Sequence, residues 1–142
     1  MNKDLERALE VLEKENYTCV LCKEEKLLSS RRRGVAPLLE LLDSGEQLGG
    51  FSAADRVVGK AAAMLYVLMG VKCVHARVMS EGAKQVLINA GIDCLYNELV
   101  PAIFNRTNTG FCPMETAVHH IDDPRLAPEL IKERLRQLNS GN

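Results

Sequence analysis

The sequence carries no excess charge of either sign. Among its 142 residues, 18 Lys and Arg stand against 19 Asp and Glu, which gives a formal net charge of −1 at pH 7. The chain therefore lacks the basic field that drives general binding to nucleic acid or to membrane surfaces. For this reason nucleic acid is not an expected partner, whereas a small molecule or a protein is.

Long apolar runs are also missing. No apolar stretch approaches the roughly 20 residues that cross a membrane, and the charged, amphipathic residues 1–15 lack the apolar core of a signal peptide. We therefore expect a cytoplasmic protein without membrane contact. Because no repeat, low-complexity tract or long linker divides the chain, residues 1–142 are expected to form a single domain.

The chain also lacks an even number of cysteines. It has five, so they cannot all form disulfide pairs within the chain. Four of them, Cys19, Cys22, Cys73 and Cys94, lie in apolar runs typical of strands, which favours reduced, buried thiols over a disulfide framework. Cys19 and Cys22 have the spacing of a redox or metal motif, but on a strand they point to opposite faces, and no second pair exists. We expect no metal site and no cofactor.

What the sequence does contain is an alternation of helical and extended patterns. Apolar residues at helical spacing, with capping and Pro signals, predict helices at residues 3–15, 35–44, 81–90, 113–121 and 128–138. Short apolar runs predict a hairpin of 17–23 with 26–31, and later strands at 71–78 and 92–96. This order predicts the α/β class, as a three-layer α/β/α sandwich with a mixed sheet.

The most apolar stretch runs from Phe51 to Gly70. Ser52 with Asp55 resembles a capping box, and Gly70 is the residue type that ends a helix. The stretch is therefore predicted to be one long buried helix, which Gly59 and the alanines after it keep thin enough to lie close against the sheet.

Four residues near predicted helix starts are candidates for ligand binding: Asp55, Arg56, Lys60 and Ser80. Ligands of α/β sheets collect at the carboxyl ends of parallel strands and at helix N-termini, where free N–H groups attract anions. Arg106, in a polar loop, is a further candidate. Each also has a structural interpretation, since Asp55 and Ser80 are ordinary helix caps and the stem of Lys60 can pack while its ammonium reaches water.

Cys112 is the cysteine that lies outside a strand-like run. It precedes Pro113 at a predicted helix start, a location that can make a thiol reactive. With Glu115 one turn further on and His119 and His120 beyond, Cys112 could act as a nucleophile. Cys112 and Glu115 are therefore the catalytic candidates, with no reaction assigned to them.

Three segments carry a resemblance to a known family. DRVVGKAAA (55–63), VKCVHARVMS (71–80) and FCPMET (111–116) resemble domain of unknown function 1893, an uncharacterised family of the cytidine-deaminase-like superfamily. The resemblance extends over nearly the whole chain and implies a single deaminase-like domain. It implies no particular reaction.

The zinc motif of the deaminases is missing from this sequence. Those enzymes carry His/Cys-Ala-Glu at one helix start and Pro-Cys-x-x-Cys at the next. The first motif falls on Val58 and Lys60, and the second falls on Glu81 and Lys84. Because a lysine ammonium cannot bind zinc, we do not expect a zinc-dependent deaminase.

Three hypotheses follow for the function. The first is a deaminase-like domain that binds a small anionic molecule, such as a nucleotide or related metabolite. The second is a cysteine-dependent enzyme that uses Cys112. The third is a protein or RNA interaction module whose surface is the basic cluster of residues 31–33. Whether the chain forms a homo-oligomer stays open.

Overall fold

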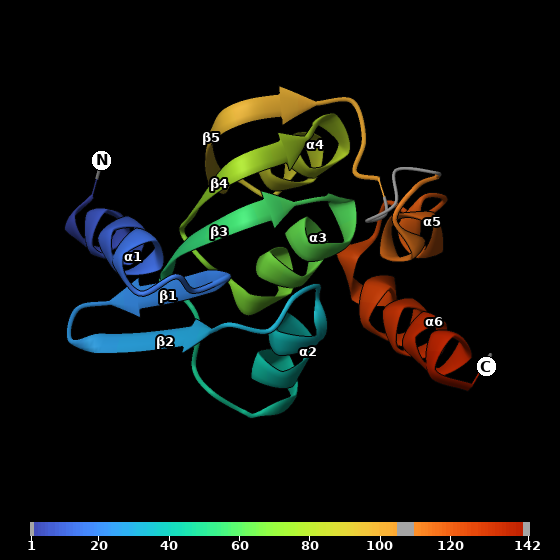
Figure 1. Cartoon of the computed structure of the whole chain (residues 1–142), viewed down its shortest axis with the longest axis horizontal. Coiled ribbons are helices and arrows are strands. Elements are labelled where there is room, and N and C mark those ends of the chain that lie inside the picture. The colour runs from blue at the N-terminus through green and yellow to red at the C-terminus, as the bar shows by residue number, and fades with distance from the viewer. Residues whose placement is uncertain (1, 105–109, 141–142) are drawn as a thin grey trace.

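The computed structural model describes residues 2–104 and 110–140. Its elements follow one another as α1 (Lys3–Lys14), β1 (Cys19–Lys23), β2 (Lys26–Ser30), α2 (Ala36–Asp43), β3 (Ser52–Val58), α3 (Lys60–Met69), β4 (Cys73–Ser80), α4 (Glu81–Asn89), β5 (Asp93–Val100), α5 (Pro113–Val118), a short 3₁₀ helix η1 (Pro124–Leu126) and α6 (Ala127–Ser140) (Figure 1). The predicted hairpin, the two later strands and the predicted helices other than the long central one are confirmed, with shifts of a few residues at their ends.

The sheet is mixed and has five strands in the order β2-β1-β3-β4-β5. Strand β1 runs antiparallel to both β2 and β3, whereas β3, β4 and β5 are parallel to one another. Helices α3 and α4 make the two crossovers between the parallel strands. The carboxyl ends of these strands point toward α5, so side chains from all of them can meet at that edge (Figure 1).

Helices lie on both faces of the sheet. Helix α1 buries Leu5, Ala8 and Leu12, and a small cluster joins it to Val20 and Ala54 on one face. The larger core lies on the other face, between the sheet and the helices from α2 onward. Among the described residues, no helix has the length and apolarity needed to cross a membrane.

The predicted long helix is wrong in its first half. Residues 52–58 form strand β3 in the middle of the sheet, and helix α3 begins only at Lys60, after Gly59. A stretch that is apolar on every side is compatible with a buried strand as well as a buried helix, because neither shows amphipathic periodicity. Neither Ser52 nor Asp55 is therefore a helix cap. Ser52 is fully buried, and its hydroxyl donates a hydrogen bond to Asn2 Oδ1 at 3.2 Å.

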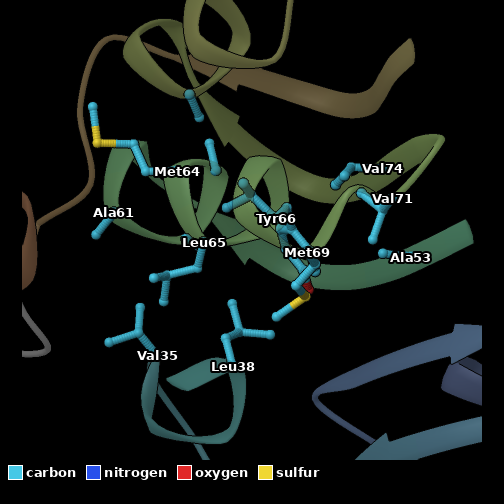
Figure 2. Close-up of a cluster of buried hydrophobic side chains, with 14 of the residues drawn as sticks. Val35, Leu38, Ala53, Ala61, Met64, Leu65, Tyr66, Met69, Val71 and Val74 are labelled. Carbon is cyan, nitrogen blue, oxygen red and sulfur yellow. The ribbon is translucent and has the colours of Figure 1, made fainter. Parts of the chain in front are cut away.

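Helix α3 is the centre of the larger core. Most of its residues are buried, and in Figure 2 Leu65 points toward Val35 and Leu38 of the α2 segment. Gly70 ends the helix with φ of 77°, in the left-handed region that glycine adopts most easily. Helix α3 packs against the sheet on one side and against other helices on the other. This packing fixes the start of α3 beside the end of β3.

Candidate functional site

A pocket of about 460 Å³ lies beyond the end of β3, and we call it the Asp55 pocket. Its wall is mostly apolar and is built from the end of β3, the starts of β1, α2 and α3, the segment after β5, and α5. The lining residues are Thr18, Cys19, Arg33, Gly34, Val35, Leu38, Asp55, Arg56, Val57, Gly59, Ala62, Ile103, Phe104, Cys112, Met114 and Glu115. A pocket of this volume, with few polar groups in an apolar wall, is typical of small-molecule sites.

The environment of Asp55 in this pocket perturbs its carboxyl group. Its Oδ2 accepts a hydrogen bond from the Tyr66 hydroxyl at 2.6 Å, and its Oδ1 accepts from the N–H groups of Arg56 at 2.7 Å and Val57 at 3.4 Å. Burial raises the pKa of Asp55 to about 6, although these hydrogen bonds act in the opposite direction. A carboxyl group with such a pKa can exchange its proton near neutral pH, which is a property of acid–base groups in functional sites.

The positive charge of Arg56 is directed away from the pocket. Its Nε donates to the carbonyl of Tyr17 at 2.6 Å, and its Nη2 donates to the carbonyl of Leu12 at 3.1 Å. These carbonyls lie at and just after the end of α1, where a cation is favoured by the helix dipole. Arg56 therefore lines the pocket, while its guanidinium holds α1 against the sheet.

Glu115 supplies the cap that α3 does not have in its own sequence. Its Oε1 accepts from the N–H of Lys60 at 2.7 Å, and its Oε2 accepts from the N–H of Ala61 at 3.0 Å. Gly59, at the N-cap position, has no side chain for this purpose, and a Cβ atom there would lie 2.5 Å from the Glu115 carboxyl carbon. The helix start expected to attract an external anion thus holds a carboxylate of the chain itself.

Two other ligand-binding candidates, Lys60 and Ser80, lie outside the pocket lining. The ammonium of Lys60 donates to the carbonyl of His119 at 3.1 Å, and Lys60 lines a separate surface groove with Gly82. Ser80 is buried, and its Oγ accepts from the N–H of Ala83 at 3.1 Å as the cap of α4. Arg106 falls outside the described residues. The structure thus brings Asp55 and Arg56 together and leaves Lys60 and Ser80 apart from them.

Both catalytic candidates line the Asp55 pocket. Cys112 is partly buried at the N-cap position of α5, and its N–H donates to the carbonyl of Ile103 at 3.0 Å. It is a free thiol. The expected histidine partners, His119 and His120, are exposed residues that follow α5, and they are not among the lining residues.

Comparison with known proteins identifies the family. The family model for the domain of unknown function DUF1893 matches residues 7–135. The chain belongs to the DUF1893 family. It is also similar to the crystal structure of a DUF1893 family protein, TM1506, from Thermotoga maritima, with 30% sequence identity and a TM-score of 0.83. That match covers 96% of this chain and 92% of the other. No curated protein matches the chain.

Sequence reasoning missed one residue that contributes to the pocket of this DUF1893 domain and did not single out another. Tyr66, which holds Asp55, was missed, whereas Arg33, which lines the pocket from the segment before α2, was named only as part of the basic cluster of residues 31–33. A sequence signal existed for Tyr66, because a buried tyrosine in an apolar helix needs a partner for its hydroxyl. Within the basic cluster of residues 31–33, no signal distinguished Arg33, because its position depends on how β2 connects to α2.

A zinc ion does not fit this DUF1893 domain at the positions that the deaminase resemblance implies. At the start of α3, Val58 is fully buried, and the first two N–H groups of the helix already bind Glu115. At the start of α4, Glu81 and Lys84 occupy the two cysteine positions. In the part of the chain that the structure describes, no three His, Cys, Asp or Glu residues are grouped so that they could hold a metal.

Proposed function

We propose that this domain binds a small molecule with an anionic group, such as a nucleotide or related metabolite, in the Asp55 pocket. The observation that carries the proposal is the pocket itself, about 460 Å³ in volume, with apolar walls and the half-buried carboxyl group of Asp55, whose pKa is raised to about 6. Apolar walls favour binding of a ligand ring, and the carboxyl group of Asp55, at a fixed place in the wall, orients that ring.

We further propose that the fold is a cytidine-deaminase-like three-layer α/β/α sandwich that lacks the zinc site. The element order supports this, since a helix and a hairpin precede two strand–helix–strand crossovers. The pocket adjoins the start of α3, near Val58 and Lys60, onto which the sequence resemblance places the first zinc motif. Because a fold does not determine a reaction, deamination is no part of the proposal.

Arg33 is our candidate for the anionic group of the ligand. Of the three consecutive arginines, Arg31 lies over the ring of Tyr17 and binds the carbonyl of Glu15, and Arg32 pairs with Glu40. Arg33 is exposed and lines the Asp55 pocket. A guanidinium in this position can bind a phosphate or carboxylate with two parallel hydrogen bonds.

Thermal denaturation with nucleoside monophosphates and the matching nucleosides tests the proposal. We expect a monophosphate to raise the melting temperature more than its nucleoside does, with a stabilisation of roughly 2.7 kcal/mol at about 100 times its Kd. Arg33→Met should remove the advantage of the monophosphate, whereas Arg32→Met, the neighbouring control, should retain it.

The Lys60→Met variant separates two positions for the anion. If it keeps the full shift, the anion does not depend on the groove that contains Lys60. If it loses the shift while Arg33→Met keeps it, the anion binds at the starts of α3 and α4 instead. A melting curve that no member of the panel moves would contradict the proposed function.

A second candidate function is favoured by one observation, that Cys112 lines the same pocket as Asp55. For a cysteine-dependent enzyme, we expect iodoacetamide at neutral pH to modify Cys112 about tenfold faster than Cys94, which is also partly buried. Peptide mass spectrometry measures both rates in one sample. Equal rates, or slower reaction of Cys112, would remove the support for a nucleophilic role.

A further inference from the structure

We infer that Asp55 determines the specificity of the pocket by accepting a hydrogen bond from an amino group on the ring of the ligand. The ligand class is then a nitrogen heterocycle with an exocyclic amino group, attached to the anionic part that Arg33 contacts. This inference rests on the proposed function and names the chemistry that the site selects.

The hydrogen bonds of Asp55 leave one acceptor position open. An ionised carboxylate accepts through two oxygens, each with two lone pairs, and donates nothing. Oδ1 accepts from two backbone N–H groups, those of Arg56 and Val57, whereas Oδ2 accepts from Tyr66. One lone pair on Oδ2 therefore stays available to a ligand in the pocket. Only a donor can use it, and a ring without a donor would cover this half-buried oxygen and leave it without a second partner, at a cost in binding.

Three of the charged and titratable groups that line the pocket with Asp55 do not compete for this role. Cys19, opposite Asp55 on β1, stays neutral because burial raises the pKa of its thiol to about 12. From α5, Glu115 is bound to the start of α3, while the guanidinium of Arg56 binds the carbonyls of Tyr17 and Leu12.

The walls of the pocket suit a flat ring. Leu38 of α2, Ala62 of α3 and Met114 of α5 line it with apolar atoms. Phe104 also lines it, and one face of the Phe104 ring is stacked on Phe111, with ring centroids 5.5 Å apart. Phe104 is 50% exposed, which leaves aromatic surface on which a heterocycle can stack.

Isothermal titration calorimetry with two matched pairs of nucleotides tests the inference. Adenosine 5′-monophosphate is compared with purine riboside 5′-monophosphate, and cytidine 5′-monophosphate with its 2-pyrimidinone counterpart, because each pair differs by one amino group. At about pH 7.5, where Asp55 is ionised, we expect the amino member of the pair that binds to bind at least about tenfold more tightly.

Asp55→Asn changes the open acceptor into a donor. The backbone N–H groups of Arg56 and Val57 keep the remaining carbonyl oxygen at the Oδ1 position, so the amide nitrogen takes the place of Oδ2. We expect the preference for the amino ring to fall below about twofold in this variant. Asp93→Asn, a control at the exposed start of β5, should keep the wild-type preference.

The wild-type protein provides a second measurement that needs no variant. At about pH 5.5 the Asp55 carboxyl is largely protonated, so it becomes a donor and the preference for the amino ring should decrease. Equal affinities within each pair at both pH values would overturn the inference and leave the proposed function standing. Failure of every nucleotide to bind would overturn both.

Discussion

Replacing Gly59 with leucine should lower the free energy of unfolding by about 2–4 kcal/mol. The first carbon of any side chain at this position would lie 2.5 Å from the carboxyl carbon of Glu115. Glu115 would have to leave the two N–H groups at the start of α3, and the isobutyl group would overpack a buried position. Urea denaturation monitored by circular dichroism measures the change.

Two further comparisons identify the cause of that loss. Gly49→Ala is the control, because nothing lies within 4 Å of a Cβ atom at Gly49. Gly59→Ala should be much less destabilising in a Glu115→Ala background than in the wild type, since the two residues conflict directly. Additive effects of Gly59→Ala and Glu115→Ala would show that the contact with Glu115 is not the reason for glycine at this position.

The stability of the wild-type protein should fall relative to Asp55→Asn as the pH rises from about 4 to about 7. The pKa of Asp55 is raised from an ordinary value of 3.8 to about 6 in the folded protein, so the folded state binds the proton more tightly than the unfolded state. Below the unfolded pKa this preference contributes fully to stability, and it is lost as the pH rises through the folded pKa.

The size of this effect follows from the shift. Folding raises the pKa of Asp55 by about two units. Between about pH 4 and about pH 7, the unfolding free energy of the wild type should therefore fall by about 3 kcal/mol relative to that of Asp55→Asn. Chemical denaturation of both proteins across this pH range measures the difference, with Asp93→Asn as the exposed control. If the unfolding free energies of the wild type and Asp55→Asn changed with pH in the same way, the pKa of Asp55 in the folded protein would be the ordinary one.

Prediction of the fold from the sequence was limited by β3. Helix α1 could be predicted because water on one side and the sheet on the other impose a helical period on its apolar residues. Strand β3 has sheet neighbours on both edges and packed helices on both faces, so its residues Ala53, Ala54 and Val58 are all fully buried and show no period. Gly59 was interpreted as a small helix residue, whereas it marks the junction of strand and helix.

Residues of the candidate site could be found where a local sequence pattern marked them, but their assembly into one pocket could not be predicted. Asp55 and Arg56 were found because they lie at the predicted start of an apolar helix, although residues 52–58 form strand β3. Cys112 and Glu115 were found at the start of α5. Arg33 comes from a different segment, and its approach to the pocket depends on tertiary packing that no local pattern describes. The role of Glu115 as the cap of α3 could not be predicted for the same reason, since 55 residues separate it from Lys60.

Because Glu115 of α5 caps the start of α3, helices α3 and α5 form a single cooperative unit. If α5 leaves its place, the N–H groups of Lys60 and Ala61 lose their acceptor, so the first turn of α3 and the wall of the pocket loosen in the same event. The rate of amide hydrogen exchange at Lys60 and Ala61, in the middle of the chain, therefore measures how often α5 leaves its docked position. The C-terminal part of the domain is thus required to keep the site intact, even though the sheet that forms its base is complete by Val100.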